Sequence, residues 1–298
     1  MASKIFYALA FTCFLFLSSL SHTAWTHPNV QNESPFEFIR HLQGSKKGDK
    51  VEGVDQLKKF LHHFGYLTHG GLNNDEVDDD YFDETIERAL KTYQINFNLK
   101  PTGVLDAETV SLMMKPRCGV PDIVDGKTRM KSAGSYNIDY ALFPGSPKWP
   151  ETTKVLNWGY RPGTRKDVLN PLAKYCFKPW GDRLPFTFKF VERNLRIADI
   201  TIGFLKNGQG GMDGGKEAFA YPPTDGRVFF NADLNWSFGA APGAYDFLTV
   251  GLHELGHALG LAHSSIKGAV MWPYTGMNET RVLQDDDVHG IEALYGVH

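Results

Sequence analysis

The chain has 298 residues, of which 42% are hydrophobic and 22% charged, a composition ordinary for a globular protein with room for two modest domains. Thirty-four acidic and thirty-one basic residues leave a formal charge of −3, and without a basic surplus nucleic acid is not expected as a partner. Three cysteines are too few for a disulfide scaffold.

Residues 1–24 have the pattern of a secretory signal peptide. A short cationic start precedes an apolar run from Ile5 to Leu20, and small residues follow it. The alternative is an uncleaved membrane anchor, because about twenty apolar residues can span a bilayer. We expect cleavage after Ser21 or near Ala24, which predicts a secreted, extracellular protein with no transmembrane segment after cleavage. Three glycosylation sequons are compatible with this location, at Asn32, Asn235 and Asn278.

Residues 22–50 are polar and irregular, which predicts a mobile leader, whereas residues 50–115 show helical periodicity. A first helix is expected over residues 54–64. A second begins at the acidic residues 83–84, and a third is capped by Asp106. The pattern predicts a small three-helix unit, near the lower size limit for independent stability.

A glycine-rich and basic connector, residues 123–135, separates this unit from a second domain that ends at residue 298. Strands mixed with three helices make the second domain α+β. We expect Pro179 to end the first of these helices, because proline lacks the N–H that a helix interior needs. The expected strands cover 154–160, 186–191, 198–204 and 227–232, and the helices lie around 168–175, 246–262 and 288–294.

The stretch HELGHALGLAH, which starts at His253, carries most of the functional information. His253 and His257 are four residues apart, so on a helix they share a face and can bind one metal ion. Glu254 projects beside them as a base for a water molecule, and Gly260 permits the turn that brings His263 to the metal. Three imidazoles leave a zinc ion one open position, which is typical of a catalytic site.

The alternative to a metal site is an amphipathic helix with surface histidines. Five fixed positions at about 5% each make a chance match rare, roughly one per million windows. At these residues the chain resembles a metzincin, and within that class a matrix metalloproteinase of plant type, a matrixin. The resemblance implies a zinc-dependent endopeptidase acting on proteins or peptides of the extracellular matrix or cell wall, in the apoplast or matrix. It also implies a catalytic domain with a mixed twisted sheet and three helices.

Met271, in the run AVMWP, matches the family's Met-turn, which the resemblance implies forms a hydrophobic base under the zinc site. Spacing alone does not distinguish it from a methionine that fills the core. By the same resemblance, Pro273 and Tyr274 help to wall the specificity pocket.

The segment PRCGVPD, residues 116–122, carries a cysteine at position 118. A thiolate is a strong zinc ligand, so Cys118 could occupy the position that catalysis needs. The alternative is an exposed free cysteine in a turn. The segment resembles the family's cysteine switch at every position, which implies that Arg117 and Asp122 pair to hold it. The resemblance thus implies a latent zymogen, activated when another protease cuts the linker 123–136.

By resemblance, residues 50–115 look like a peptidoglycan-binding-like prodomain, which we interpret as an inhibitory and folding module. The alternative is a cell-wall glycan binder, because a fold-level likeness does not establish a function. The expected organisation is a signal peptide over 1–24, a propeptide over 25–135 and a catalytic domain over 136–298.

The sequence departs from the family at its second, structural zinc. No histidine occurs between residues 191 and 252. The family's histidines fall at about Gln209 or Gly210, at Phe219 and at Phe229, and aromatic rings cannot ligate zinc. Our hypothesis is that the two rings pack together and replace the metal, which leaves one catalytic zinc.

Calcium binding is left open, because the ion needs six or more oxygens. Asp199, Asp213 and Asp233 are present, but the family's downstream acidic cluster begins here with Asn231. Cys176 is expected to be a buried small hydrophobe. The loss of the second zinc motivates an alternative function, a non-catalytic, matrix-associated binding or regulatory protein. The complete zinc and switch motifs favour the secreted, latent endopeptidase.

Overall fold

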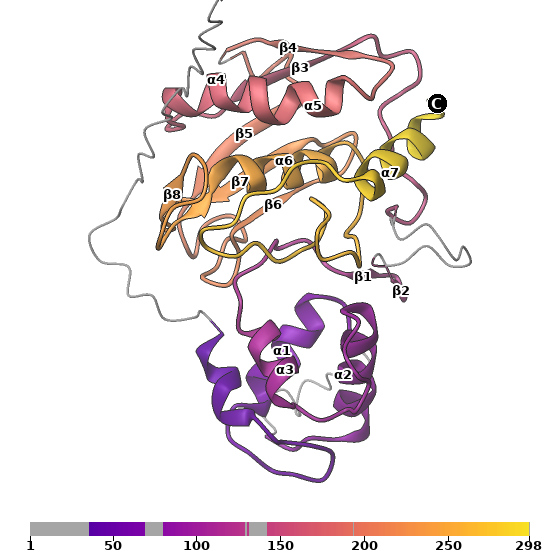
Figure 1. Ribbon diagram of the computed structural model, residues 1–298, viewed down its shortest axis with the longest axis vertical. Coiled ribbons are helices and arrows are strands. Elements are labelled where there is room, and N and C mark those ends of the chain that lie inside the picture. The colour runs from indigo at the N-terminus through magenta and orange to yellow at the C-terminus, as the bar shows by residue number, and fades with distance from the viewer. Residues whose placement is uncertain (1–35, 69–79, 129, 131–141, 193, 298) are drawn as a thin grey trace, which may run out of the picture.

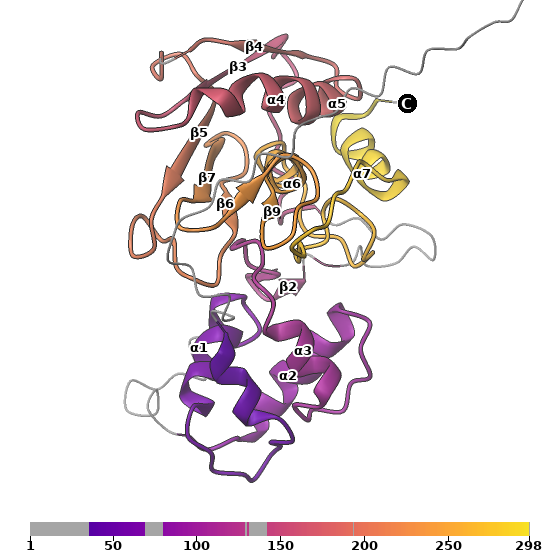
Figure 2. The ribbon, with the colours of Figure 1, turned by 60° about the vertical axis from the view of Figure 1, so that its left-hand side comes forward.

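The computed structural model describes residues 36–68, 80–128, 130, 142–192 and 194–297, and Figure 1 shows two lobes. A helical lobe is built from the N-terminal part of the described chain, and a larger lobe contains the main sheet. Figure 2 shows the same arrangement after rotation, with strand β2 between the lobes. The expected signal peptide, Asn32 and residues 131–141 lie outside the described residues.

The helical lobe contains the three predicted helices, α1 (Val54–His63), α2 (Glu84–Asn96) and α3 (Ala107–Met113). The carboxylates of Asp83 and Asp106 cap α2 and α3 by accepting backbone N–H groups at 2.8 and 2.9 Å. A 3-10 helix, η1 (Glu37–Leu42), lies within the segment that we expected to be an irregular leader. Its two buried residues, Ile39 and Leu42, are too few to mark a helix in a polar stretch.

The core of the helical lobe includes two aromatic residues from the other lobe, Trp272 and Tyr274. The ring of Phe97, at the end of α2, lies 5.2 Å from each of them in edge-on contact. The small lobe therefore completes its core with side chains from the Met271 region.

The large lobe contains a five-stranded sheet in the order β4-β3-β5-β7-β6. Four strands are parallel, and β6 pairs antiparallel with β7 at one edge. β6 was not predicted, because three residues are too short for a pattern. The strands are β3 (Val155–Tyr160), β4 (Thr187–Phe190), β5 (Ile200–Leu205), β6 (Ala218–Ala220) and β7 (Arg227–Asn231). Two small pairs are β1 (Ile123–Val124) with β2 (Lys127–Thr128), and β8 (Trp236–Ser237) with β9 (Tyr245–Asp246).

The first helical stretch of the large lobe corrects the prediction for Pro179. The helix continues to Gly181 through four consecutive segments: η3 (Lys166–Val168), α4 (Leu169–Leu172), the π-helix η4 (Ala173–Phe177) and α5 (Lys178–Gly181). Proline loses one helical hydrogen bond and crowds the carbonyl four residues earlier. The wider π turn just before Pro179 relieves this conflict, so the proline is accommodated.

Helices α6 (Phe247–Ala258) and α7 (Asp285–Tyr295) complete the large lobe. α6 packs against η4 and the sheet, and the Trp180 indole donates to the Leu252 carbonyl oxygen at 2.9 Å. Cys176 is fully buried against this helix, as predicted. Among the residues that the structure describes, no helix has the length and apolarity needed to cross a bilayer.

Candidate active site

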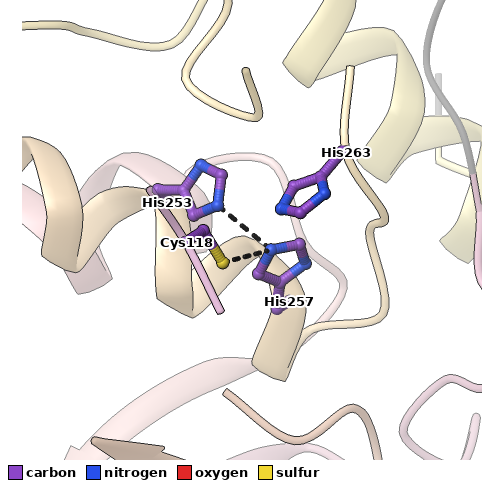
Figure 3. A group of neighbouring side chains, drawn as sticks. All are labelled: Cys118, His253, His257 and His263. Atoms are coloured by element: carbon purple, nitrogen blue, oxygen red, sulfur yellow. Dashed lines mark hydrogen bonds between the residues drawn. The ribbon is translucent and has the colours of Figure 1, made fainter. Parts of the chain in front are cut away.

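Four side chains from three parts of the chain converge at the end of α6 (Figure 3). His253 and His257 lie on the helix, His263 follows it, and Cys118 comes from the segment between the lobes. Their ligand atoms all lie within 4.8 Å of one another, and all four residues are buried. Gly260 has φ +107°, and a Cβ there would lie 2.3 Å from the Pro147 carbonyl oxygen, so only glycine permits this turn.

Hydrogen bonds behind the imidazoles fix which nitrogen faces the centre. Nδ1 of His253 bonds to the Val270 carbonyl oxygen at 2.7 Å, and Nδ1 of His257 bonds to the Leu261 carbonyl oxygen at 2.8 Å. Carbonyl oxygens only accept, so each Nδ1 carries the proton and each Nε2 presents a lone pair. These two Nε2 atoms are 3.1 Å apart, and Cys118 Sγ lies 3.5 Å from Nε2 of His257.

This donor set fits zinc. A tetrahedral zinc ion with bonds of about 2.0–2.3 Å holds its ligand atoms roughly 3.3–3.8 Å apart. Lone pairs that converge in a buried space repel one another unless a cation lies between them. Outer hydrogen bonds to metal-binding histidines are typical of zinc sites.

Glu254 is buried beside the four side chains. Burial raises the pKa of Glu254 to about 8, and the nearby Cys118 thiol partly opposes this rise. Burial, together with the nearby Glu254 carboxylate, also raises the pKa of the Cys118 thiol well above its usual value. A bound dication would favour the anionic form of both groups.

Met271 packs against α6. A Cβ at Gly256 would lie 2.4 Å from the Met271 sulfur, so the helix rests on this side chain. Asp287, at the start of α7, accepts the backbone N–H groups of Val270 and Met271 at 2.9 Å each. It thereby fixes the carbonyl of Val270 that orients His253. We did not single out Asp287 from the sequence, although it stands in a run of three aspartates at a helix start.

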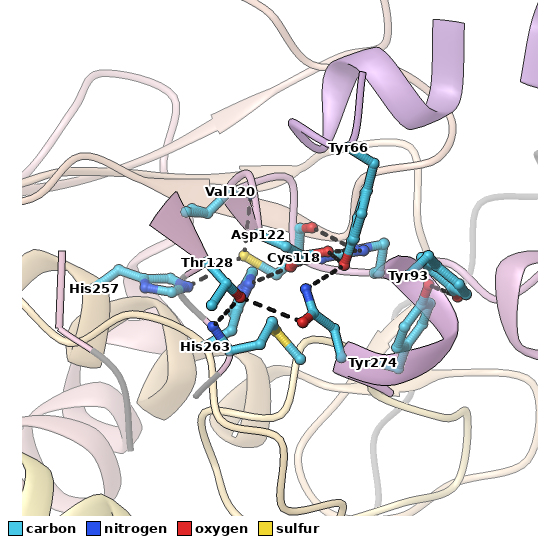
Figure 4. A network of polar contacts seen from close by, with 12 residues as sticks. Tyr66, Tyr93, Cys118, Val120, Asp122, Thr128, His257, His263 and Tyr274 are labelled. Carbon is cyan, nitrogen blue, oxygen red and sulfur yellow. Dashed lines mark hydrogen bonds and ion pairs between the residues drawn. The ribbon is translucent and has the colours of Figure 1, made fainter. Parts of the chain in front are cut away.

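Arg117 and Asp122 form the predicted pair, with two hydrogen bonds of 2.9 and 2.6 Å and both side chains fully buried. Asp122 also accepts hydrogen bonds from the Tyr66 hydroxyl and from Nδ1 of His263, each at 2.8 Å. Figure 4 shows these residues around the carboxylate. Burial alone would raise the pKa of Asp122, but Arg117 and His263 hold it well below its usual range. The guanidinium lies 3.8 Å above the ring of Phe64. The contacts of Asp122 with Tyr66 and His263 were not predicted.

The backbone around Cys118 lies between two segments of the large lobe, residues 215–218 and the loop at Pro273, which we call the two banks of the cleft. On one side, Arg117 bonds to Gly215 and Glu217 at 3.2 and 2.9 Å, and Gly119 bonds to Ala218 at 2.8 Å. On the other side, the Cys118 N–H donates to the Pro273 carbonyl oxygen at 2.9 Å. The segment therefore lies beside the chain that leads into β6, with one isolated parallel bridge between Arg117 and Lys216.

Two family models match the chain. The matrixin model matches residues 148–296, and a peptidoglycan-binding domain model matches residues 50–113. Metalloendoproteinase 5-MMP of Arabidopsis thaliana is 33% identical over 91% of this chain and 81% of its own. Metalloendoproteinase 1 of Glycine max is 33% identical over 95% and 96%, and human matrilysin is 35% identical over 71% and 77%.

This chain belongs to the matrixin family. It is accordingly a zinc metalloendopeptidase, and the matrixin resemblance and the α+β fold predicted from the sequence are confirmed.

Phe219 and Phe229 of this matrixin lie opposite each other on β6 and β7. Their ring centroids are 5.5 Å apart, and Arg161 lies over the ring of Phe229. Both rings are buried in one cluster with Met212 and Cys118. The packing that the replacement hypothesis requires is therefore present.

The remaining candidate residues of the matrixin are spread apart. Asp199 accepts a backbone N–H at 2.7 Å, Asp233 accepts another at 2.8 Å, and Asp213 pairs with Lys216 at 2.8 Å. Within the described ranges, the group of Cys118 and three histidines is the one metal-capable cluster, and it includes none of these aspartates. Of the sequons, Asn278 is exposed and Asn235 is half-buried.

Proposed function

We propose that this matrixin is a secreted endopeptidase made as a latent zymogen, in which Cys118 occupies the fourth position of the catalytic zinc. The observation that carries the proposal is the cluster of Cys118 Sγ with three imidazoles inside 4.8 Å. In this proposal residues 1–24 are a signal peptide, 25–135 a propeptide with the switch at 116–122, and 136–298 the catalytic domain. The protein is then extracellular, in the apoplast or matrix, and a glycoprotein if its sequons are used.

In the active form, His253, His257 and His263 would hold the zinc. When bound, zinc supplies Lewis-acid activation of water and of the scissile carbonyl. Glu254 takes a proton from the attacking water and passes it to the leaving amine.

Latency depends on more than the thiol. The Arg117–Asp122 pair holds the switch, and Asp122 also holds His263, so the propeptide and the metal site share one buried carboxylate. Activation must separate these contacts, for which we propose a cut by another protease within 123–136. The exposed Lys127, in the hairpin between the lobes, lies in this range.

Substrate polypeptide would replace the switch segment in the cleft. The segment now bonds to Gly215, Glu217 and Ala218 on one bank and to Pro273 on the other. A substrate chain can use the same backbone groups, with Tyr274 walling the site once Tyr93 and Phe97 leave it. Proteins of the extracellular matrix or cell wall are the proposed substrates.

The test measures zinc content and peptidase activity on a generic unfolded protein. It compares the full-length chain, the chain treated with a thiol-reactive mercurial, and a Glu254→Ala variant treated in the same way. We expect one zinc per chain, activity only after treatment, and none in the variant. Activity before treatment would remove the zymogen proposal, and zinc without activity in any form would favour the binding or regulatory protein. Two zincs would contradict the single-zinc reading.

A further inference from the structure

Glu217 is a buried acid in the cleft that the proposed chemistry does not use. It is 1% exposed and directly precedes β6, the strand that borders the switch segment. Its Oε1 atom has no hydrogen-bond partner, and Thr275 lies near the carboxyl group. A buried carboxyl oxygen without a donor is costly, so its presence needs a reason.

The position of Glu217 is tied to the switch from both sides of the cleft. The backbone N–H of Glu217 donates to the Arg117 carbonyl oxygen at 2.9 Å. Cys118, which follows Arg117, donates its N–H to Pro273 on the opposite side of the cleft. The side chain of Glu217 lies near Thr275, two residues after Pro273. Glu217 is therefore placed beside the Arg117–Cys118 peptide, one residue from the thiol that lies at the metal site.

Acidic groups outnumber cationic groups around this carboxyl. Burial raises the pKa of Glu217 well above its usual value, and the charges of Glu254 and Glu279 add to this, whereas Arg281 opposes it. Arg281 is already engaged: its guanidinium donates to the carbonyl oxygens of Trp272 and Tyr274 and pairs with Glu279 at 3.1 Å. The site thus contains the carboxyl groups of Glu217, Glu254 and Glu279 and one cation, Arg281, which already has hydrogen-bond partners.

We propose that Glu217 is a specificity-determining residue, which selects a lysine or arginine side chain of the substrate next to the scissile bond. The inference rests on the proposed replacement of the switch by substrate. A cationic side chain supplies donors to the unpaired oxygen and favours the ionised form of Glu217 with which it pairs. An apolar side chain leaves that oxygen buried and unsatisfied, which is how polar sites reject apolar analogues.

The experiment uses mercurial-activated full-length protein and matched fluorogenic peptides. At each of the two positions flanking the scissile bond, the peptides carry either lysine or its uncharged analogue norleucine. At one of these positions we expect kcat/KM for lysine to exceed that for norleucine by about 10- to 100-fold. In Glu217→Gln, which keeps the shape and removes the charge, the preference should fall to within about threefold. Glu279→Gln, an exposed acid nearby, should retain it.

Binding of the same peptides to a Glu254→Ala protein separates this inference from the proposed function. If lysine peptides bind more tightly than norleucine peptides but wild type cleaves neither, the proposed peptidase activity is contradicted and the role of Glu217 is supported. Wild type that handles norleucine as well as lysine at both positions overturns the inference, whatever the stability of Glu217→Gln. A preference that survives Glu217→Gln, in protein with normal zinc content, overturns it as well.

Discussion

The metal centre and the aromatic pair occupy neighbouring parts of the large lobe but use burial in opposite ways. At the metal centre three imidazoles are buried with their lone pairs converging, and each Nδ1 is bonded to an oxygen. At Phe219 and Phe229 the buried space is filled with hydrocarbon, with ring centroids 5.5 Å apart. The first arrangement is completed by a cation, whereas the second is complete without one.

This difference indicates how a metal site can be replaced without loss of stability. Removing one ligand from the first arrangement leaves polar groups buried without partners, which costs free energy. Replacing a whole ligand set by well-packed apolar groups can be neutral or stabilising. The replacement hypothesis needs both positions to change together, and Phe219 and Phe229 meet this need because they face each other on one strand pair, where each ring supplies the other's contact.

The largest effect is expected from Glu254→Gln, which tests the chemistry of the metal centre alone. After activation, kcat should fall about 10²- to 10⁴-fold, because the base for water is lost. Zinc content should remain that of wild type, since Glu254 is not among the four clustered ligand residues. Loss of zinc in this variant would mean that Glu254 contributes to binding, not only to proton transfer.

Phe229→Ala tests the aromatic pair in the same protein. The free energy of unfolding of the latent chain should fall by about 3–5 kcal/mol, because a buried ring and its contacts with Phe219 and Arg161 are lost. Denaturant unfolding measures it. The matched control is Ile197→Ala, at an exposed apolar side chain, which should change stability by less than about 0.5 kcal/mol. An unchanged stability for Phe229→Ala would mean that the rings do not support this region.

Sequence alone predicted the metal centre because its chemistry depends on fixed spacings. The four-residue step from His253 to His257 follows from helix geometry, and Gly260 marks the turn to His263. The role of Asp122 was only half predicted. Its pairing with Arg117 is local, but its bonds to Tyr66 and His263 join residues 56 and 141 positions away, which no local pattern encodes.

The fold was predictable where hydrophobic periodicity is long, and less so in short elements. β6 has three residues and η1 has two buried ones, too few to show a period. The continuation of the helix through Pro179 depends on a π turn, which has no sequence signature in this chain. The entry of Trp272 and Tyr274 into the core of the helical lobe is a tertiary effect.

Restoring histidines tests whether the aromatic pair replaced a metal site. Two triple variants share Phe219→His and Phe229→His and add either Gln209→His or Gly210→His. Gly210 lines the same recess as Phe219, although its φ of +53° makes a side chain there strained. We expect zinc to rise from one to two per chain in one of the variants. Without the metal, each buried imidazole should cost about 1–3 kcal/mol of stability, recovered when zinc is added. One zinc in both variants would contradict the alignment that located the lost ligands.

The smallest effect is expected at a hydrogen bond between the two lobes. This contact involves the loop next to the metal centre and neither ring of the Phe219–Phe229 pair. The hydroxyl groups of Tyr93 and Tyr274 bond at 2.7 Å across the two lobes, both buried. Tyr93→Phe removes one hydrogen bond worth about 1 kcal/mol, so activity should appear about fivefold faster at a fixed mercurial concentration. Thr92→Ala, which removes an exposed hydroxyl bonded within the same helix, should activate at the wild-type rate. Because the ring of Tyr93 stays in place, faster activation would assign part of the latency to a polar contact remote from Cys118. An unchanged rate would instead leave the docking of the helical lobe to the apolar contacts of Phe97 with Trp272.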